Sequence, residues 1–210
     1  MIKIVSLLFL GAGIFLLVQV IAPLLSYKFW EMTVYAKQTE LISPVSTGQV
    51  SGISIIDKDG FSAFVSENHR LSVPPYQEFK VSIPRINLNS IKTLVDSQDF
   101  ENNLAHLPGS ALPGERGNVF ITGHSGLPGP LNPSRKAFFK SLPDMKKGDQ
   151  IFVEAGGQKF EYVVEKLIIV DPKETWVVNP PDNNGRYLSL MTCVPPGTTL
   201  KRLVVLARLK

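Results

Sequence analysis

The hydrophobic pattern separates the beginning of the chain from the rest of it. Residues 4–26 contain no charged side chain, whereas from residue 76 onward short apolar stretches are divided by glycines and prolines. Roughly 20 apolar residues are enough to cross a bilayer as a helix, and the apolar part of a cleavable signal peptide is shorter, about 7–15 residues. We therefore predict that residues 1–30 form an uncleaved transmembrane signal anchor.

Residues 31–75 are predicted to form a stalk between this anchor and a folded domain. The stalk is expected to hold three kinds of local structure: a short helix at 31–41, a linker at 43–52 and a hairpin at 52–65. The hairpin prediction depends on the turn sequence Asp-Lys-Asp-Gly at 57–60, which has apolar residues on both sides. Pro74 and Pro75 end the stalk, so residues 76–210 are expected to form the folded domain.

Most of this domain follows the two-residue period of β-strands. Apolar stretches bounded by turn residues predict strands at 79–83, 86–91, 118–122, 151–154, 159–165, 187–193 and 202–208. Helical signals are sparse, with one at 96–104 and one that is opened by Asn132-Pro133 and ends before Pro143. Residues 171–185 are expected to be a long loop. Many short strands with few helices favour a mainly β fold that closes into a barrel.

The only cysteine, Cys193, ends the strand predicted at 187–193 and precedes a Pro-Pro-Gly turn. If residues 194–201 close a hairpin to the next strand, position 193 faces 202, 191 faces 204 and 189 faces 206. Directly opposed residues share a face of a sheet. The sequence therefore predicts that the Cys193 thiol and the Arg202 guanidinium lie side by side at the open end of a two-stranded ribbon.

A thiol beside a guanidinium indicates nucleophilic chemistry. The thiolate is the reactive form, and a neighbouring positive charge lowers the pKa of the thiol. Arg202 supplies charge but no proton transfer, so a histidine is needed as acid and base. Of the three histidines we favour His124, which follows an apolar strand in a glycine-rich loop. We interpret His69 and His106 as structural or solvated.

Composition narrows the function classes. A chain of 210 residues with a net charge of +4 suits one domain and an appendage, and a single cysteine excludes an intramolecular disulfide. No basic stripe interleaved with aromatic residues occurs, so we expect no nucleic-acid partner. A zinc site from His106, His124 and Cys193 would lack close ligand spacing, so we expect no metal and no other cofactor.

Three sequence motifs resemble those of sortases. Thr192-Cys193, followed nine residues later by Arg202 in Arg-Leu-Val, is similar to the Thr-Leu-x-Thr-Cys and Arg-Leu-Val signatures of that family. Residues 105–124 resemble the segment that leads to the catalytic histidine of sortases. The resemblance covers roughly residues 76–210 and implies the closed β-barrel of this family, with a few short helices.

The resemblance also implies roles for four residues. Cys193 would be the nucleophile, His124 the acid and base, and Arg202 the group that positions substrate and stabilises the oxyanion. Thr192, directly before the nucleophile, would take part in substrate binding.

A reaction and its partners follow from the same resemblance. A membrane-anchored cysteine transpeptidase of this family cleaves an LPxTG-like sorting signal of surface proteins between Thr and Gly. It then passes the acyl group to an amine, either a peptidoglycan precursor or a pilin lysine. We expect a single-pass protein of a bacterial cell membrane, with its catalytic domain on the extracellular side, that anchors surface proteins covalently to the cell wall.

Three alternatives stay open. A pilin-polymerising sortase is disfavoured because the sequence shows no second apolar span and no Asp-Pro-aromatic lid sequence. An L,D-transpeptidase would also use Cys, His and Arg, but its Ser-x-Gly-Cys context is absent. A catalytically silent, membrane-tethered binding or assembly module would keep the barrel, and the presence of all three reactive residues argues against it.

Overall fold

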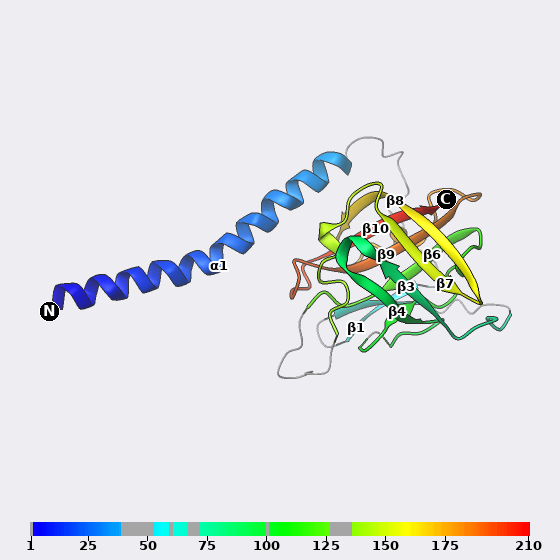
Figure 1. Ribbon diagram of the computed structural model, residues 1–210, viewed down its shortest axis with the longest axis horizontal. Helices are drawn as coiled ribbons and strands as arrows, with labels where there is room; N and C mark the ends of the chain where they lie inside the picture. The colour runs from blue at the N-terminus through cyan, green and yellow to red at the C-terminus, as the bar shows by residue number, and fades with distance from the viewer. Residues whose placement is uncertain (1, 39–52, 59–60, 67–71, 100, 127–135) are drawn as a thin grey trace. The chain divides into compact units, whose positions relative to one another are not determined.

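The computed structural model describes the chain except for residues 1, 39–52, 59–60, 67–71, 100 and 127–135 (Figure 1). The chain forms two compact units, residues 1–42 and residues 43–210. The linker predicted at 43–52 lies outside the described residues.

The first unit contains one long helix, α1 (Ile2–Gln38). By length and composition its segment Leu7–Val34 could cross a membrane, which agrees with the expected apolar helix. The helix continues through the residues for which we predicted a separate short helix at 31–41, as far as Gln38. The domain boundary predicted at Pro74-Pro75 stays a prediction.

The second unit is a closed barrel of eight strands, which confirms the predicted fold class. The order around the barrel is β10-β8-β7-β3-β4-β5-β6-β9. The strands are β3 (Glu78–Ile83), β4 (Leu88–Leu94), β5 (Leu104–His106), β6 (Gly117–Thr122), β7 (Gln150–Ala155), β8 (Gln158–Val170), β9 (Arg186–Val194) and β10 (Lys201–Leu209). Most neighbours are antiparallel, but β4 pairs with β5, and β6 with β9, in parallel.

Strand β9 is buried on both faces after its first residue. One set of alternate residues, including Leu188 and Leu190, is fully buried with residues from the other strands. The other set includes Met191, which belongs to an apolar cluster with Val204 of β10 and Phe120 of β6. Burial on both faces explains why this strand has an almost continuous apolar sequence.

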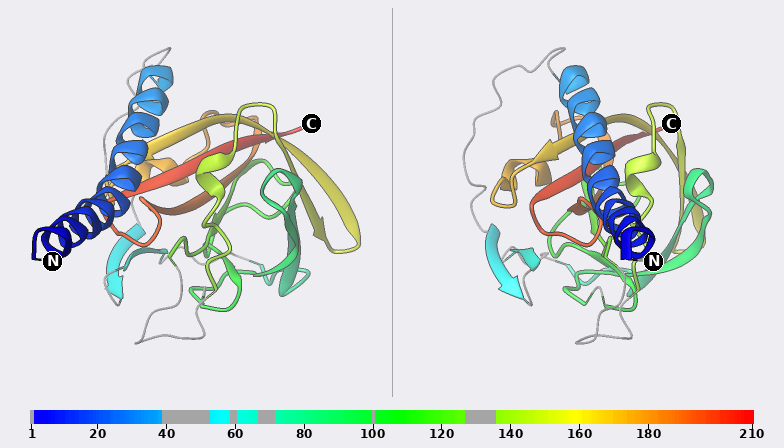
Figure 2. Two further views of the ribbon diagram at one scale, coloured as in Figure 1. Left: turned by 60° about the vertical axis from the view of Figure 1, so that its left-hand side comes forward. Right: turned by 90° about the vertical axis from the view of Figure 1, so that its left-hand side faces the viewer.

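A hairpin of β1 (Ile53–Lys58) and β2 (Phe61–Ser66) forms a separate two-stranded sheet outside the barrel (Figure 2). This pairing confirms the predicted hairpin, and its tip at 59–60 lies outside the described residues. Phe64 of β2 packs on Phe120 of β6, with ring centroids 6.1 Å apart and planes tilted by 32°. The hairpin therefore covers part of the outer face of the barrel.

The helix predicted at 96–104 is wrong in its described residues, which form turns and the start of β5. Asp96 has a left-handed φ of 47°. The Ser97 hydroxyl accepts a hydrogen bond from the Asp99 N–H, and the Asp99 carboxylate accepts one from the Glu101 N–H. Such local side-chain bonds to the backbone compete with helical hydrogen bonds.

The other expected helix begins, at Asn132-Pro133, outside the described residues. Its described remainder, 136–141, is not helical but forms a turn before a short 3-10 helix, η2 (Leu142–Asp144), which includes Pro143. The loop predicted at 171–185 contains a further 3-10 helix, η3 (Thr175–Val178). A third, η1 (Pro84–Ile86), connects β3 and β4.

Candidate active site

The pairing of β9 with β10 places Cys193 directly opposite Arg202. The same ladder pairs Met191 with Val204 and Ser189 with Leu206, so the predicted register is confirmed. The ribbon is not two-stranded, however, because β6 and β8 extend it on either side. The pair thus lies within a wide sheet rather than at the end of an isolated hairpin.

The parallel pairing of β6 with β9 brings the segment before His124 alongside β9. Thr122 pairs with Met191, and the next N–H, of Gly123, donates to the Met191 carbonyl over 3.2 Å. His124 lies two residues beyond this last pair and outside the ladder. The structure therefore pairs Cys193 with Arg202, and the placement of His124 beside them stays a prediction.

Two glycines allow the segments that carry His124 and Cys193 to pack closely against their neighbours. A Cβ at Gly123 would lie 2.6 Å from Leu104 and 2.8 Å from Phe139, both fully buried side chains. A Cβ at Gly126 would lie 3.3 Å from the Cα of Gly197 in the turn after β9. The loop that carries the histidine therefore touches the turn that follows the cysteine.

All three side chains are nearly or fully buried: Cys193 is 4% exposed, His124 5% and Arg202 0%. The Nη1 group of Arg202 donates to the carbonyls of Thr199 and Lys201, 3.1 and 3.2 Å away. The guanidinium therefore holds the β9–β10 turn and sets a fixed positive charge beside the thiol. We expected an open position at the mouth of a ribbon, and the structure gives a closed one.

A family model described as a Sortase domain matches residues 81–210. The chain belongs to the sortase family. Sortase D of Bacillus subtilis (strain 168) is 28% identical over 129 residues, which are 60% of this chain and 60% of that protein. Sortase A of Bacillus anthracis is 31% identical over 132 residues, 60% of this chain and 56% of the relative. The chain thus covers less than two thirds of the length of these curated relatives.

Solved sortase structures share the fold. Sortase A of Corynebacterium diphtheriae, in a lid mutant, matches with a TM-score of 0.56 and 32% identity, over 66% of this chain and 72% of that one. Sortase C1 of Streptococcus agalactiae matches with a TM-score of 0.57 and 27% identity, over 64% of this chain and 68% of that one. The barrel described above is therefore a sortase barrel.

Thr192, expected to bind substrate, is fully buried in this sortase barrel. Its hydroxyl donates to the carbonyl of Gly123 over 2.7 Å. Because Gly123 precedes His124 and Thr192 precedes Cys193, this bond connects the neighbours of two residues that are predicted to react. The substrate-binding role of Thr192 stays a prediction, and its hydroxyl has a structural partner.

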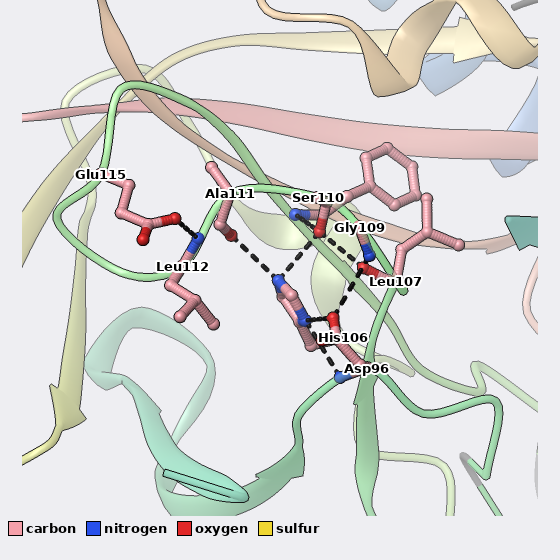
Figure 3. A network of polar contacts seen from close by, with 9 residues as sticks. Asp96, His106, Leu107, Gly109, Ser110, Ala111, Leu112 and Glu115 are labelled. Carbon is pink, nitrogen blue, oxygen red and sulfur yellow. Dashed lines mark hydrogen bonds and ion pairs between the residues drawn. The ribbon is translucent and has the colours of Figure 1, made fainter. Parts of the chain in front are cut away.

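His106, which we interpreted as structural or solvated, is fully buried at the end of β5 (Figure 3). The backbone N–H of Asp96 lies 3.2 Å from its Nδ1, and the Asp96 carboxylate lies 3.3 Å from the same nitrogen. Its Nε2 lies 2.9 Å from the Ala111 carbonyl and 2.8 Å from the Ser110 hydroxyl.

Hydrogen bonds of the same network stabilise the β5–β6 loop (Figure 3). The Ser110 hydroxyl donates to the Leu107 carbonyl, and Glu115 accepts a hydrogen bond from the Leu112 N–H over 2.7 Å. These bonds connect both sides of the loop to the end of β5. His106 is therefore a structural cross-link of the sortase barrel and not a member of the reactive group.

Sequence reasoning missed two further groups of side-chain hydrogen bonds, which hold β9 and the loop before it. The side-chain amide of Asn118 in β6 donates to the carbonyls of Val177 and Val178 in η3, 3.4 and 3.0 Å away. The Tyr187 hydroxyl donates to the Asp182 carboxylate over 2.5 Å. Burial and this bond raise the pKa of Tyr187 to about 12, and the same bond holds the pKa of Asp182 below its ordinary value. Asn118, a polar residue within the apolar strand β6, was the sequence feature that could have indicated the first of these contacts.

Proposed function

We propose that the protein is a membrane-anchored cysteine transpeptidase. The observation that supports this proposal is the cross-strand pair of Cys193 and Arg202, with His124 two residues past the last pair of the neighbouring β6–β9 ladder. Nucleophilic catalysis by cysteine needs a nearby acid–base group and stabilisation of the developing negative charge. His124 and Arg202 are the residues proposed for these two roles.

In the proposed reaction, the Cys193 thiolate attacks the carbonyl carbon of the threonine in an LPxTG-like sorting signal. A C–S bond forms, and the oxyanion is stabilised by the positive charge of Arg202. His124, protonated, gives its proton to the glycine nitrogen as the C–N bond breaks, which leaves a thioester. An acceptor amine then attacks the thioester, loses a proton to His124 and releases the thiolate.

The proposed acceptor is a peptidoglycan precursor, which would make the protein an enzyme of covalent cell-wall anchoring. A pilin lysine is the second candidate, because the match to sortase C1 of Streptococcus agalactiae is as good as the match to sortase A of Corynebacterium diphtheriae. Supplying a glycine-type amine and a lysine side chain in competition tests the choice, since the ratio of the two products gives the preference directly.

The decisive experiment compares the full chain, in detergent, with its Cys193→Ala variant on an LPxTG-containing peptide. The wild-type protein is expected to form a thioester adduct detectable by mass spectrometry, and the variant to form none. Cys193→Ala leaves only a small cavity, so its thermal unfolding should remain close to that of wild type. A folded wild-type protein that forms no adduct with any sorting-signal peptide would support the silent binding module instead.

We further propose that α1 anchors the protein in a bacterial cell membrane with the barrel outside. Its apolar segment Leu7–Val34 supports this assignment. The full chain should therefore remain in the membrane pellet after carbonate extraction, and added protease should digest the barrel in intact, wall-stripped cells. Intact protein in the culture medium would contradict the anchor, and a protected barrel would contradict the orientation.

A further inference from the structure

Ser125, the residue after His124, carries a buried hydroxyl group that has no hydrogen-bond partner. Its side chain is 2% exposed, and its Oγ makes no hydrogen bond to any residue that the structure describes. Buried hydroxyl groups are nearly always hydrogen-bonded, because an unmade bond of this kind costs stability. A hydroxyl that stays unpaired in the folded protein is therefore suited to a partner that binds later, during the reaction.

The segment that carries this serine, residues 123–126, is held against the end of β9 and the turn that follows it. The carbonyl of its first residue accepts a hydrogen bond from the Thr192 hydroxyl over 2.7 Å. At its other end, a Cβ on Gly126 would lie 3.3 Å from the Cα of Gly197. These two contacts lie before and after Cys193 in the chain, so the serine between them belongs to the part of the barrel that carries the thiol.

Ser189 of β9 is a second buried serine of this kind, and its position differs. It is 0% exposed, and its Oγ likewise has no hydrogen-bond partner among the described residues. It lies within the ladders, paired with Phe120 of β6 and Leu206 of β10. Ser125 lies in a loop beyond the end of β6, where a ligand can bind without separating paired strands.

The amine-transfer step of the proposed function leaves one hydrogen-bond position to be filled. A neutral amine attacks the thioester carbonyl carbon, so that a C–N bond forms and the C–S bond breaks. His124 takes one of the two N–H protons, and the sulfur leaves as the Cys193 thiolate. The second N–H stays in the new amide and needs an acceptor. Arg202 cannot supply one, because a guanidinium has hydrogen-bond donors only.

We propose that the Ser125 hydroxyl accepts a hydrogen bond from this second N–H and so binds the incoming amine; the role rests on the proposed function. A serine hydroxyl has two acceptor lone pairs and carries no charge. A carboxylate in its place would favour the unreactive ammonium form of the amine, because an opposite charge stabilises the charged form. Ser125 is thus assigned to the acceptor amine and not to the sorting signal.

The test measures acylation and amine transfer separately in the full chain, in detergent, and in its Ser125→Ala variant. A sorting-signal peptide is supplied together with triglycine or with Nα-acetyllysine, and the transfer and hydrolysis products are quantified. Ser125→Ala should form the thioester at a rate near that of wild type. Its ratio of transfer to hydrolysis should decrease about three- to tenfold, which is the effect of one neutral hydrogen bond.

The matched control is Ser189→Ala, which removes a buried hydroxyl that also lacks a partner among the described residues. It should leave acylation and the transfer ratio near those of wild type. Both variants should unfold at a temperature close to that of wild type, because neither removes a hydrogen bond. A clearly lower unfolding temperature of Ser125→Ala would mean that its hydroxyl stabilises the fold, which contradicts the proposal.

The other outcomes separate this role from the proposed function. An unchanged transfer ratio in Ser125→Ala, or an equal decrease in Ser189→Ala, would overturn the role of Ser125. Slower acylation with an unchanged ratio would assign Ser125 to the sorting signal, and a wild-type thioester that is only hydrolysed would mean that no amine site exists; both overturn the role. A wild-type protein that forms no thioester with any sorting-signal peptide would remove the proposed function and this role together.

Discussion

His106 and His124 are both buried near the ends of neighbouring strands, yet their surroundings differ in kind. The ring of His106 contacts the loops on either side of β5, through the Asp96 N–H on one nitrogen and the Ala111 carbonyl on the other. His124 follows β6, two residues beyond the last pair of the parallel β6–β9 ladder. The first histidine connects backbone groups that are close in sequence, and the second joins segments that are far apart.

The two histidines also differ in their place relative to the sheet. His106 is the last residue of β5 and pairs with Ile121. His124 lies two residues beyond Thr122, where β6 and its pairing with β9 end. A buried histidine whose two nitrogens bind backbone groups of the loops on either side of β5 stabilises those loops, whereas His124 is proposed to transfer protons. Substitutions should therefore separate the two by activity and by stability.

Among variants that keep Cys193, the largest expected effect on activity is that of His124→Ala. Loss of a positioned acid–base group should lower turnover by about 10²–10⁴-fold. The folded barrel should remain, because the substitution lies beyond the last pair of the β6–β9 ladder. Peptide acylation and amine transfer, measured separately beside thermal unfolding, would show this. Near-normal turnover would remove the distinction between the histidines.

Arg202→Lys is expected to have the next largest effect on activity, although it keeps the positive charge. The guanidinium of Arg202 donates through Nη1 to two carbonyls of the β9–β10 turn, and a lysine ammonium on a flexible stem cannot reproduce this planar geometry. Since loss of one oxyanion donor typically costs about 10²–10³-fold, we expect a decrease of that order in acylation. Arg202→Ala is the companion variant. Lysine with near-normal rates in both steps would mean that only the charge matters.

His106→Ala should have the smallest effect on activity and a clear effect on stability. The substitution leaves the Asp96 N–H and the Ala111 carbonyl without their buried partner. Each unsatisfied buried group costs about 1–3 kcal/mol, so the unfolding midpoint should decrease by several degrees. Turnover per folded molecule should remain within the same order of magnitude as wild type. His106→Gln, which keeps a donor and an acceptor, should recover part of the lost stability, and a loss of turnover matching His124→Ala would contradict the comparison.

Much of the barrel could be predicted from the sequence because its strands are short and bounded by strong turn residues. The clearest success is the register that sets Cys193 opposite Arg202, which followed from counting through one turn. The parallel β6–β9 pair was not predicted, because no local pattern encodes a pairing between segments so far apart. We favoured His124 because it follows an apolar strand in a glycine-rich loop and because of the family resemblance, and its place beside Cys193 and Arg202 stays a prediction.

The errors have local physical causes. Residues 96–104 contain helix-compatible polar residues, but the hydroxyl of Ser97 and the carboxylate of Asp99 bind backbone N–H groups in turns. Burial of Cys193, His124 and Arg202 was also missed, because burial depends on packing between segments that are far apart in the sequence, as with Phe64 and Met191. Tertiary packing of this kind leaves little trace in short-range patterns.

The parallel pairing of β6 with β9 bears on the stage of folding at which the Cys193 thiol would become reactive. The hydrogen bond between Thr192 and Gly123 spans 69 residues of chain, and it forms only when the ring closes. Until β6 pairs with β9, the segment that carries His124 is not held against the strand that carries Cys193. Under the proposed function, an unfolded chain would therefore lack its acid–base residue beside the thiol and would be less reactive toward peptides than the completed barrel.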